Sequence, residues 1–83
     1  MTRADNLIVG DVVDYRGLPA TVQDVSIGRK VEIIIEWDEA GSSHRCRITY
    51  PILTAYEWNM DWTEEDFAAR READLQAEQF TVL

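Results

Sequence analysis

The fold is decided by one stretch of the chain, which reads Val31-Glu32-Ile33-Ile34-Ile35-Glu36-Trp37. Its β-branched residues are typical of a β-strand. Because side chains alternate across a strand, Val31, Ile33 and Ile35 share one face, whereas the acids Glu32 and Glu36 lie on the other. The stretch therefore predicts a strand with one buried face and one solvent-facing face.

The residues before this stretch predict a hairpin that runs from Ala20 to Trp37. Gly28-Arg29 is expected as a two-residue loop, with the glycine at a position that requires a positive φ angle. Pairing the strands across that loop places Val22 opposite Ile35 on the core side. The same register would bury an aspartate and expose a valine at Asp24-Val25, so we expect a bulge there that restores the alternation.

The residues after the stretch predict a second hairpin. A polar loop is expected over 38–43, followed by a strand over 44–50 in which apolar and polar residues alternate. If Trp37 and His44 flank the loop, Glu36 lies opposite Arg45. An opposite-charge pair across two strands contributes about 0.2–1 kcal/mol and favours this register.

Two shorter strands complete the expected sheet. The stretch 12–15 follows a turn signal at 9–11, and a further turn precedes Pro19, which we place at the start of the next strand. After Pro51, the stretch 52–58 is predicted as a short strand. The chain would then contain about five antiparallel strands.

A helix is predicted near the C-terminus. Thr63 is a favourable N-cap residue, and Glu64, Glu65 and Asp66 place acids in the first turn, where they complement the helix dipole. No residue up to about Gln79 would break the helix. We therefore expect a C-terminal α-helix over about 63–79.

The order of the first strands and turns resembles a known fold family. The motifs are Gly10-Asp11-Val12-Val13-Asp14-Tyr15-Arg16-Gly17, Ala20-Thr21-Val22 and Val31-Glu32-Ile33. They are similar in pattern to the start of SH3-like barrels, with the KOW and Tudor types as the nearest members, and the similarity extends from residue 9 to residue 58. It implies a mostly β protein with a small antiparallel barrel over about 9–58, and a single domain over 1–83 in which the C-terminal helix is an addition. It also implies a binding module for proteins, peptides or RNA.

Charge separates these classes of partner. Sixteen acidic residues against eight basic ones give a formal net charge of -8. Binding nucleic acid through its phosphates requires clustered cations, and the basic residues come no closer to a cluster than three pairs: Arg29-Lys30, Arg45/Arg47 and Arg70-Arg71. We therefore expect a protein partner, with a basic surface as the charge-complementary choice, and no direct binding of nucleic acid.

The sequence also predicts where the protein resides. No apolar run approaches the roughly 20 residues that cross a bilayer, and no targeting segment is visible, so we expect a cytoplasmic protein without a membrane partner. Cys46 is the one cysteine, which excludes an internal disulfide and favours a reducing compartment.

Catalytic, metal-binding and cofactor-binding motifs are missing from the sequence. His44 and Cys46 are two residues apart, with no second Cys-His group that would complete a zinc site. The four glycines are scattered and form no phosphate-binding loop. We therefore expect no enzyme, no metal and no cofactor.

One segment stands out as a candidate binding site. Two tryptophans, a tyrosine and a methionine fall within seven residues, interleaved with acids, and such residues are enriched at protein interfaces. The alternative is structural, because Trp58 or Trp62 could hold the helix against the barrel. The predicted protein-binding residues are Tyr56, Trp58, Met60, Asp61, Trp62, Glu64 and Glu65.

These observations favour a non-catalytic, acidic protein–protein interaction module. Small acidic proteins of this kind are typical of phage or mobile-element accessory factors that bind a host protein. One alternative is a virion or assembly component that self-associates. Another is a DNA mimic, in which the acids at 61–66 and the loop pair Asp38-Glu39 would occupy the basic groove of a nucleic-acid-binding protein.

Overall fold

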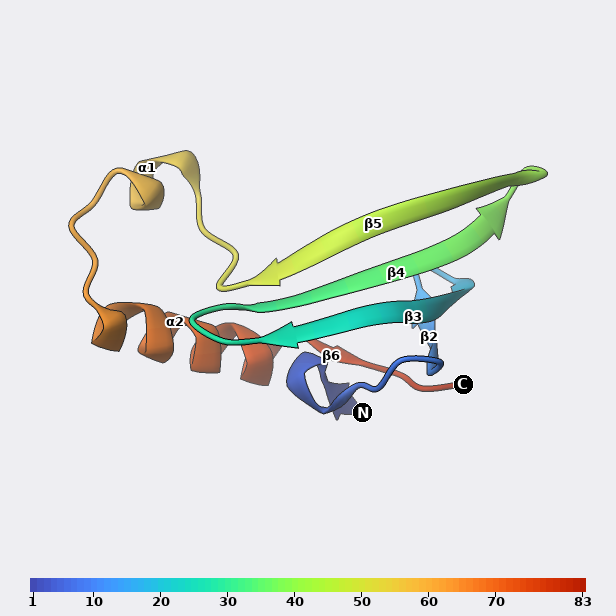
Figure 1. Cartoon of the computed structure of the whole chain (residues 1–83), viewed down its shortest axis with the longest axis horizontal. Helices are drawn as coiled ribbons and strands as arrows, with labels where there is room; N and C mark the ends of the chain where they lie inside the picture. The colour runs from blue at the N-terminus through green and yellow to red at the C-terminus, as the bar shows by residue number, and fades with distance from the viewer.

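The computed structural model describes all residues from Met1 to Leu83 and contains two antiparallel sheets and a C-terminal helix (Figure 1). The larger sheet has the strand order β2-β3-β4-β5, and β1 and β6 form the smaller one. The strands are β1 (Thr2–Arg3), β2 (Val12–Tyr15), β3 (Leu18–Ile27), β4 (Val31–Glu39), β5 (Ser42–Tyr50) and β6 (Gln79–Phe80). The helices are η1 (Ala4–Asn6, a 3₁₀ helix), α1 (Ala55–Trp58) and α2 (Glu64–Ala77).

The predicted register of the β3–β4 hairpin is confirmed at its centre, where Val22 lies opposite Ile35. The predicted two-residue loop is wrong, because Ile27 pairs with Val31 and leaves three residues in the turn. The register then shifts by one residue between Val22 and Asp24, so the bulge lies one residue before the expected place. The two offsets cancel, and the bulge keeps the Asp24 carboxylate out of the core, where an unpaired charge would be costly.

The predicted register of the β4–β5 hairpin is confirmed, with Trp37 opposite His44. The Arg45 guanidinium forms an ion pair with the Glu36 carboxylate across the two strands, at 3.1 Å. The loop is shorter than expected, because both strands continue as far as a two-residue turn at Ala40-Gly41. Both turn residues have positive φ angles, 54° and 80°, which match the twist of the flanking strands.

The strand predicted over 52–58 is wrong. After β5 the chain leaves the sheet, and Ala55–Trp58 forms the short helix α1. A reciprocal capping box begins this helix: the Glu57 amide donates to the Thr54 hydroxyl at 3.3 Å, and the Thr54 amide donates to the Glu57 carboxylate at 2.7 Å. The spacing of Thr54 and Glu57 in the sequence is therefore a helix signal. The strand prediction gave more weight to the aromatic residues around them, which are typical of strands.

The predicted C-terminal helix is confirmed as α2, which begins after the N-cap residue Thr63. The Asp66 amide donates to the Thr63 hydroxyl at 3.2 Å, and the Thr63 amide donates to the Asp66 carboxylate at 2.9 Å. The helix ends at Ala77, two residues before the expected end, because Gln79 joins β6. Neither α2, the longest helix, nor the two shorter helices have the length and apolar character that a membrane span requires.

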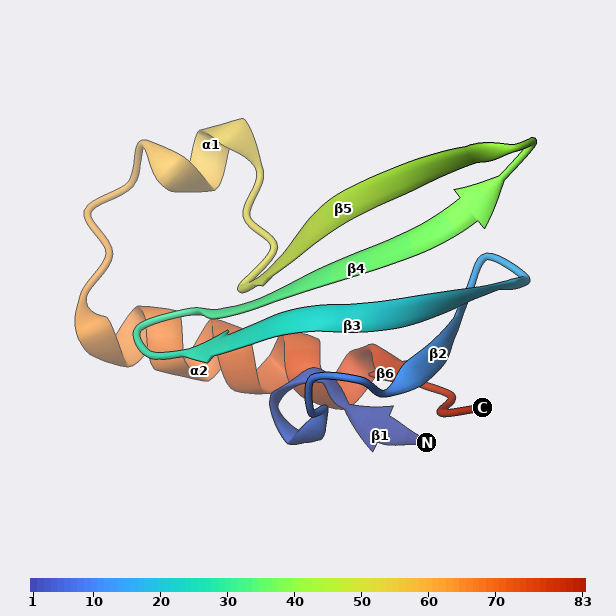
Figure 2. The same ribbon diagram turned by 45° about the vertical axis from the view of Figure 1, so that its right-hand side comes forward.

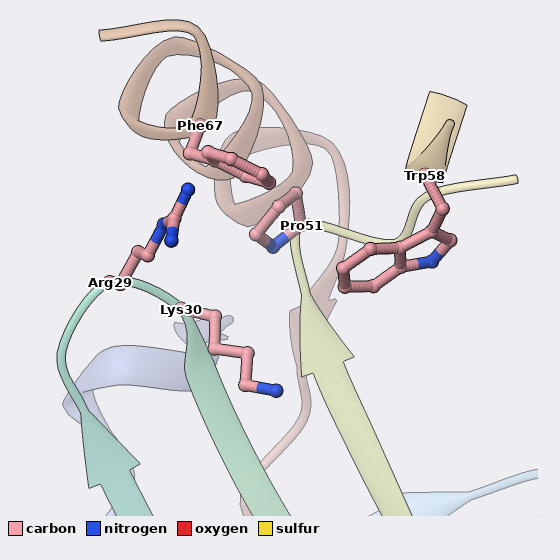
Figure 3. Close-up of a pocket in the computed structure, with 5 residues that line it drawn as sticks. All are labelled: Arg29, Lys30, Pro51, Trp58 and Phe67. Carbon is pink, nitrogen blue, oxygen red and sulfur yellow. The ribbon is translucent and has the colours of Figure 1, made fainter. Parts of the chain in front are cut away.

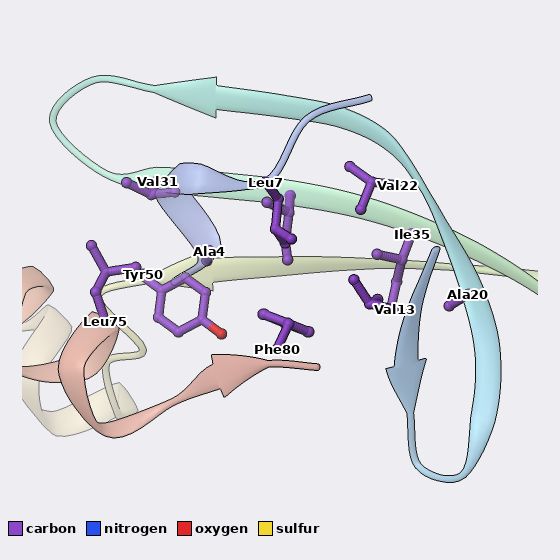
Figure 4. Close-up of a cluster of buried hydrophobic side chains, with 11 residues drawn as sticks. Ala4, Leu7, Val13, Ala20, Val22, Val31, Ile35, Tyr50, Leu75 and Phe80 are labelled. Carbon is purple, nitrogen blue, oxygen red and sulfur yellow. The ribbon is translucent and has the colours of Figure 1, made fainter. Parts of the chain in front are cut away.

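Both termini close the core over the larger sheet. Eleven buried apolar side chains form one cluster, to which Ala4, Leu7, Leu75 and Phe80 contribute from outside that sheet (Figure 4). Phe80 pairs with Thr2 across β1 and β6. The tail then runs beside β2: the Asp14 amide donates to the carbonyl of residue 81 at 2.9 Å, and the amide of residue 83 donates to the carbonyl of residue 12 at 2.7 Å. Sequence analysis assigned no strand or core position to residues 80–83, because a stretch this short carries no pattern that identifies its distant partners.

Replacing Phe80 tests whether the C-terminal tail completes the core. Phe80→Ala removes a buried ring and is expected to lower the free energy of unfolding by about 3 kcal/mol. Val82→Ala, a change at an exposed position of the same tail, is the matched control and is expected to cost well under about 1 kcal/mol. Urea denaturation of both variants measures the difference, and equal effects would contradict the account.

Tyr50 provides a second test of the core. Its side chain is fully buried, and its hydroxyl has no hydrogen-bond partner in the protein. Burial, helped by the carboxylates of Glu78 and Asp74, raises the pKa of this hydroxyl. An unpaired buried hydroxyl is destabilising, so Tyr50→Phe is expected to raise the free energy of unfolding by about 1 kcal/mol. A loss of stability in Tyr50→Phe would show that the hydroxyl is hydrogen-bonded in solution.

Candidate protein-binding site

The candidate site lies on α1 and the segments that flank it, beyond the end of β5 (Figure 1). The Arg70 side chain of α2 fixes this region. Its guanidinium forms an ion pair with Glu57 and donates to the Ile52 carbonyl at 2.9 Å and to Asp74 at 3.2 Å. Asp74 also accepts a hydrogen bond from the Ile52 amide at 2.7 Å. Polar contacts around one arginine therefore attach the segment 52–58 to α2.

These contacts also shift the protonation equilibria of the groups involved. The pKa of Glu57 is lowered, first by the hydrogen bond from the Thr54 amide and then by the Arg70 guanidinium. The pKa of Arg70 is raised, with the bond to Glu57 as the largest cause and the bond to Asp74 as the next. Both groups are therefore held in their charged forms.

Three predicted site residues lie exposed on this anchored segment or just after it. The exposed fractions are 75% for Tyr56, 57% for Trp58 and 49% for Met60. Trp58 thus lies at the surface and does not form part of the buried core. A helix that is attached by polar contacts and exposes large apolar side chains is the arrangement expected of an interaction surface.

Trp62 has a different environment. Its half-buried ring packs against Phe67 on α2, with 5.4 Å between ring centroids and 52° between planes. The Arg29 guanidinium lies 4.2 Å from the centroid of the Phe67 ring and forms an ion pair with Glu64 at 3.0 Å. Trp62 therefore packs on the start of α2, and Glu64 forms a surface ion pair in which both side chains stay exposed. Asp61 and Glu65 are exposed.

A hollow lies beside Trp58, between α2 and the β3–β4 turn (Figure 3). Its volume is about 270 Å³, and its walls are Arg29, Lys30, Pro51, Trp58 and Phe67. A second hollow of about 370 Å³ shares three of these residues and extends to β5. Sequence reasoning noted the pair Arg29-Lys30, but no sequence signal placed it beside a tryptophan from another part of the chain.

The groups considered for catalysis and metal binding lie apart from this region. The exposed His44 ring stacks on Trp37 with 5.7 Å between centroids, and the Cys46 thiol lies 3.8 Å from the Tyr15 hydroxyl. No group of three or more histidine, cysteine, aspartate or glutamate side chains is placed to hold a metal ion.

Comparison with known proteins finds no matching protein family, no matching curated protein and no matching solved structure.

The Glu57 carboxylate gives the site a pH-dependent anchor. Because its pKa is lower in the folded chain than in the unfolded one, Glu57 stabilises the fold above its usual pKa near 4.3, and this contribution is lost as the pH falls through the folded value. Glu57→Gln is therefore expected to lower the melting temperature at pH 7, with a difference from wild type that shrinks as the pH falls towards about 3.

The exposed Glu39 at the end of β4 supplies the control for this measurement. Glu39→Gln removes the same charge at a position without a side-chain partner and away from any helix terminus, and it is expected to leave the melting temperature nearly unchanged at pH 7. A Glu57→Gln difference that is constant between pH 7 and about 3 would contradict the role assigned to the Glu57 carboxylate.

Proposed function

We propose that this chain is a non-catalytic protein–protein interaction module whose binding surface is centred on α1. The observation that carries the proposal is the exposure of Tyr56, Trp58 and Met60 on and beside a four-residue helix. Aromatic residues and methionine are enriched in the centres of protein interfaces. Hot spots in particular are rich in tryptophan and tyrosine.

The position of Trp58 supports the proposal more than the number of exposed residues. Single exposed apolar residues are common on protein surfaces, whereas an aromatic ring that borders a hollow is typical of a binding site. Here Trp58 forms a wall of both hollows, and Arg70 holds its helix in place. A surface that is ordered before binding loses less entropy when a partner docks.

The proposal includes an SH3-like arrangement of the strands. If the tail bonded to β2 is counted with β6, five strands follow one another in the order β6-β2-β3-β4-β5. The two α-helices then form an insertion between the fourth and fifth strands in chain order, instead of an addition at the C-terminus. This placement would present α1 at one end of the barrel.

The other proposed functions receive less support. In the DNA-mimic alternative, acids must be free to face a basic groove, but Glu64 pairs with Arg29 and Asp66 caps α2. Asp61 and Glu65 stay exposed and are the residues through which a partner with a basic surface would be recognised. Two further roles stay predictions. One is a cytoplasmic accessory protein of a phage or mobile element, and the other is a self-associating virion component.

Two tryptophan substitutions test the proposed surface. Trp58→Ala is expected to change the melting temperature by less than about 2 °C, because the ring is exposed, and to reduce capture of the partner from a source-cell lysate at least about 30-fold. Trp62→Ala loses the contact with Phe67 and is expected to lower the melting temperature by several degrees.

Quantitative affinity capture and thermal denaturation of both variants provide the two readouts. Tyr56→Ala extends the test to another face of α1, because residues two apart on a helix do not face each other, and it is expected to reduce capture less than Trp58→Ala does. If Trp58→Ala melts as low as Trp62→Ala, or if capture is unchanged, the surface on α1 is not the binding site.

A further inference from the structure

The larger sheet has one open edge. β5 pairs with β4 and has no strand on its other side, as Figure 2 shows. The opposite edge of the sheet, at β2, is occupied by the C-terminal tail. An unpaired edge nine residues long is a site at which another extended chain can add by main-chain hydrogen bonds.

The turn geometry identifies the residues of β5 that face this open edge. After a two-residue turn, alternate residues direct their amide and carbonyl groups away from the partner strand. The turn at 16–17 illustrates the rule, because it directs Val12 and Asp14 outward and both bond to the tail. By the same rule, the turn at 40–41 directs outward the main-chain groups of Ser43, Arg45, Arg47 and Thr49.

The side chains at this edge are cationic, although the whole chain is acidic. Arg45 and Arg47 have exposed fractions of 64% and 65%, and Lys30 lies nearby. Glu36 pairs with Arg45, whereas Glu32 is shared between Lys30, at 2.9 Å, and Arg47, at 3.7 Å. Three carboxylates on the same face of β4, Glu32, Glu36 and Asp38, balance these three cations in number. β5 itself, however, carries two arginines and no acid, so the side chains next to an added strand are cationic and favour an acidic occupant.

In the register centred on β5, the same charges disfavour a second copy of this chain as the occupant. Two β5 strands paired antiparallel about a twofold axis at Cys46 would place Arg45 of each copy opposite Arg47 of the other. Like charges directly opposite each other across strands are destabilising. Arginines on an edge strand are also a common means of preventing self-association.

The open edge leads directly into the second hollow near α1. That hollow takes part of its wall from Arg47, Ile48 and Thr49 of β5 and part from Ile52 and Trp58. Its volume of about 370 Å³ is sufficient for a large apolar side chain. A chain bound along β5 would therefore place one end beside the exposed tryptophan.

We propose that β5 binds an extended, acidic segment of a partner protein as an additional strand, with an apolar side chain of that segment in the hollow beside Trp58. The inference rests on the proposed interaction function and specifies the partner's chemistry at this edge. Main-chain hydrogen bonds to the outward groups of β5 provide affinity, and Arg45, Arg47 and Lys30 select for acidic side chains. This preference differs from the basic partner surface expected from net charge alone.

The test begins with selection of a displayed library of random 12-residue peptides on the full chain. The enriched peptides are expected to carry acids at alternate positions and an apolar residue near one end. A synthetic copy of the most enriched peptide, measured by fluorescence anisotropy at low salt, is expected to bind the double variant Arg45→Gln/Arg47→Gln about 10-fold or more weakly than wild type. Arg16→Gln, at an exposed arginine in the turn between β2 and β3, which do not pair with β5, is the control and is expected to bind like wild type.

Thr49→Pro tests the main-chain contacts separately. Proline removes an outward amide that β4 does not use, so the variant is expected to fold and to lose peptide binding at least about 10-fold. The double arginine variant keeps the test decisive if this proline variant does not fold. Loss of binding in Trp58→Ala together with unchanged binding in both β5 variants would overturn the edge inference and leave the proposed function intact.

Other outcomes also contradict the inference. Enriched peptides without an excess of acids, or no enrichment at all, would overturn the acidic specificity. Sedimentation of the free protein as a dimer that Thr49→Pro converts to a monomer would show that the edge binds a second copy of the chain instead.

Discussion

Val31, Ile33 and Ile35 direct one face of β4 into the core, and this alternation determines the orientation of both neighbouring strands. β3 must place its apolar side chains on the same side, which it achieves with a bulge between Val22 and Asp24. β5 must do the same without a bulge, since its pairs with β4 run without interruption from the turn to the end of the strand. The outward face and the outer edge of β5 follow from this constraint and provide the surface proposed for binding.

A second constraint acts beyond the sheet, where little apolar surface is buried. The segment 52–58 is held by Arg70 through Glu57, Asp74 and the Ile52 carbonyl, and not by a hydrophobic contact of Trp58 with the core. Polar anchoring of this kind leaves the aromatic side chains of α1 available at the surface. It also links the site to pH, because the stabilising contribution of Glu57 depends on its charged form.

The central hairpins could be predicted from sequence because each has one apolar face and one polar face. The pairs Val22–Ile35 and Glu36–Arg45 followed from that pattern and from charge. The tail could not be predicted in this way, because β6 has two residues and its role depends on a distant partner at the N-terminus.

The segment around Trp58 was ambiguous for another reason: aromatic composition is the same for a core contact, a strand and an exposed interface. The hollow beside it joins residues from the β3–β4 turn, the end of β5 and both helices, a proximity that spacing along the chain does not encode.

Amide hydrogen exchange of the free protein, measured residue by residue by nuclear magnetic resonance, tests the central claim most directly. An ordered but open β5 edge predicts slow exchange at His44, Cys46 and Ile48, whose amides face β4, and fast exchange at Arg45 and Arg47, whose amides face solvent. Alternating protection along the strand would support the account. Uniformly slow exchange would show that another chain or segment already covers the edge, and uniformly fast exchange would show that β5 is not a stable strand. Either of these results would contradict the account.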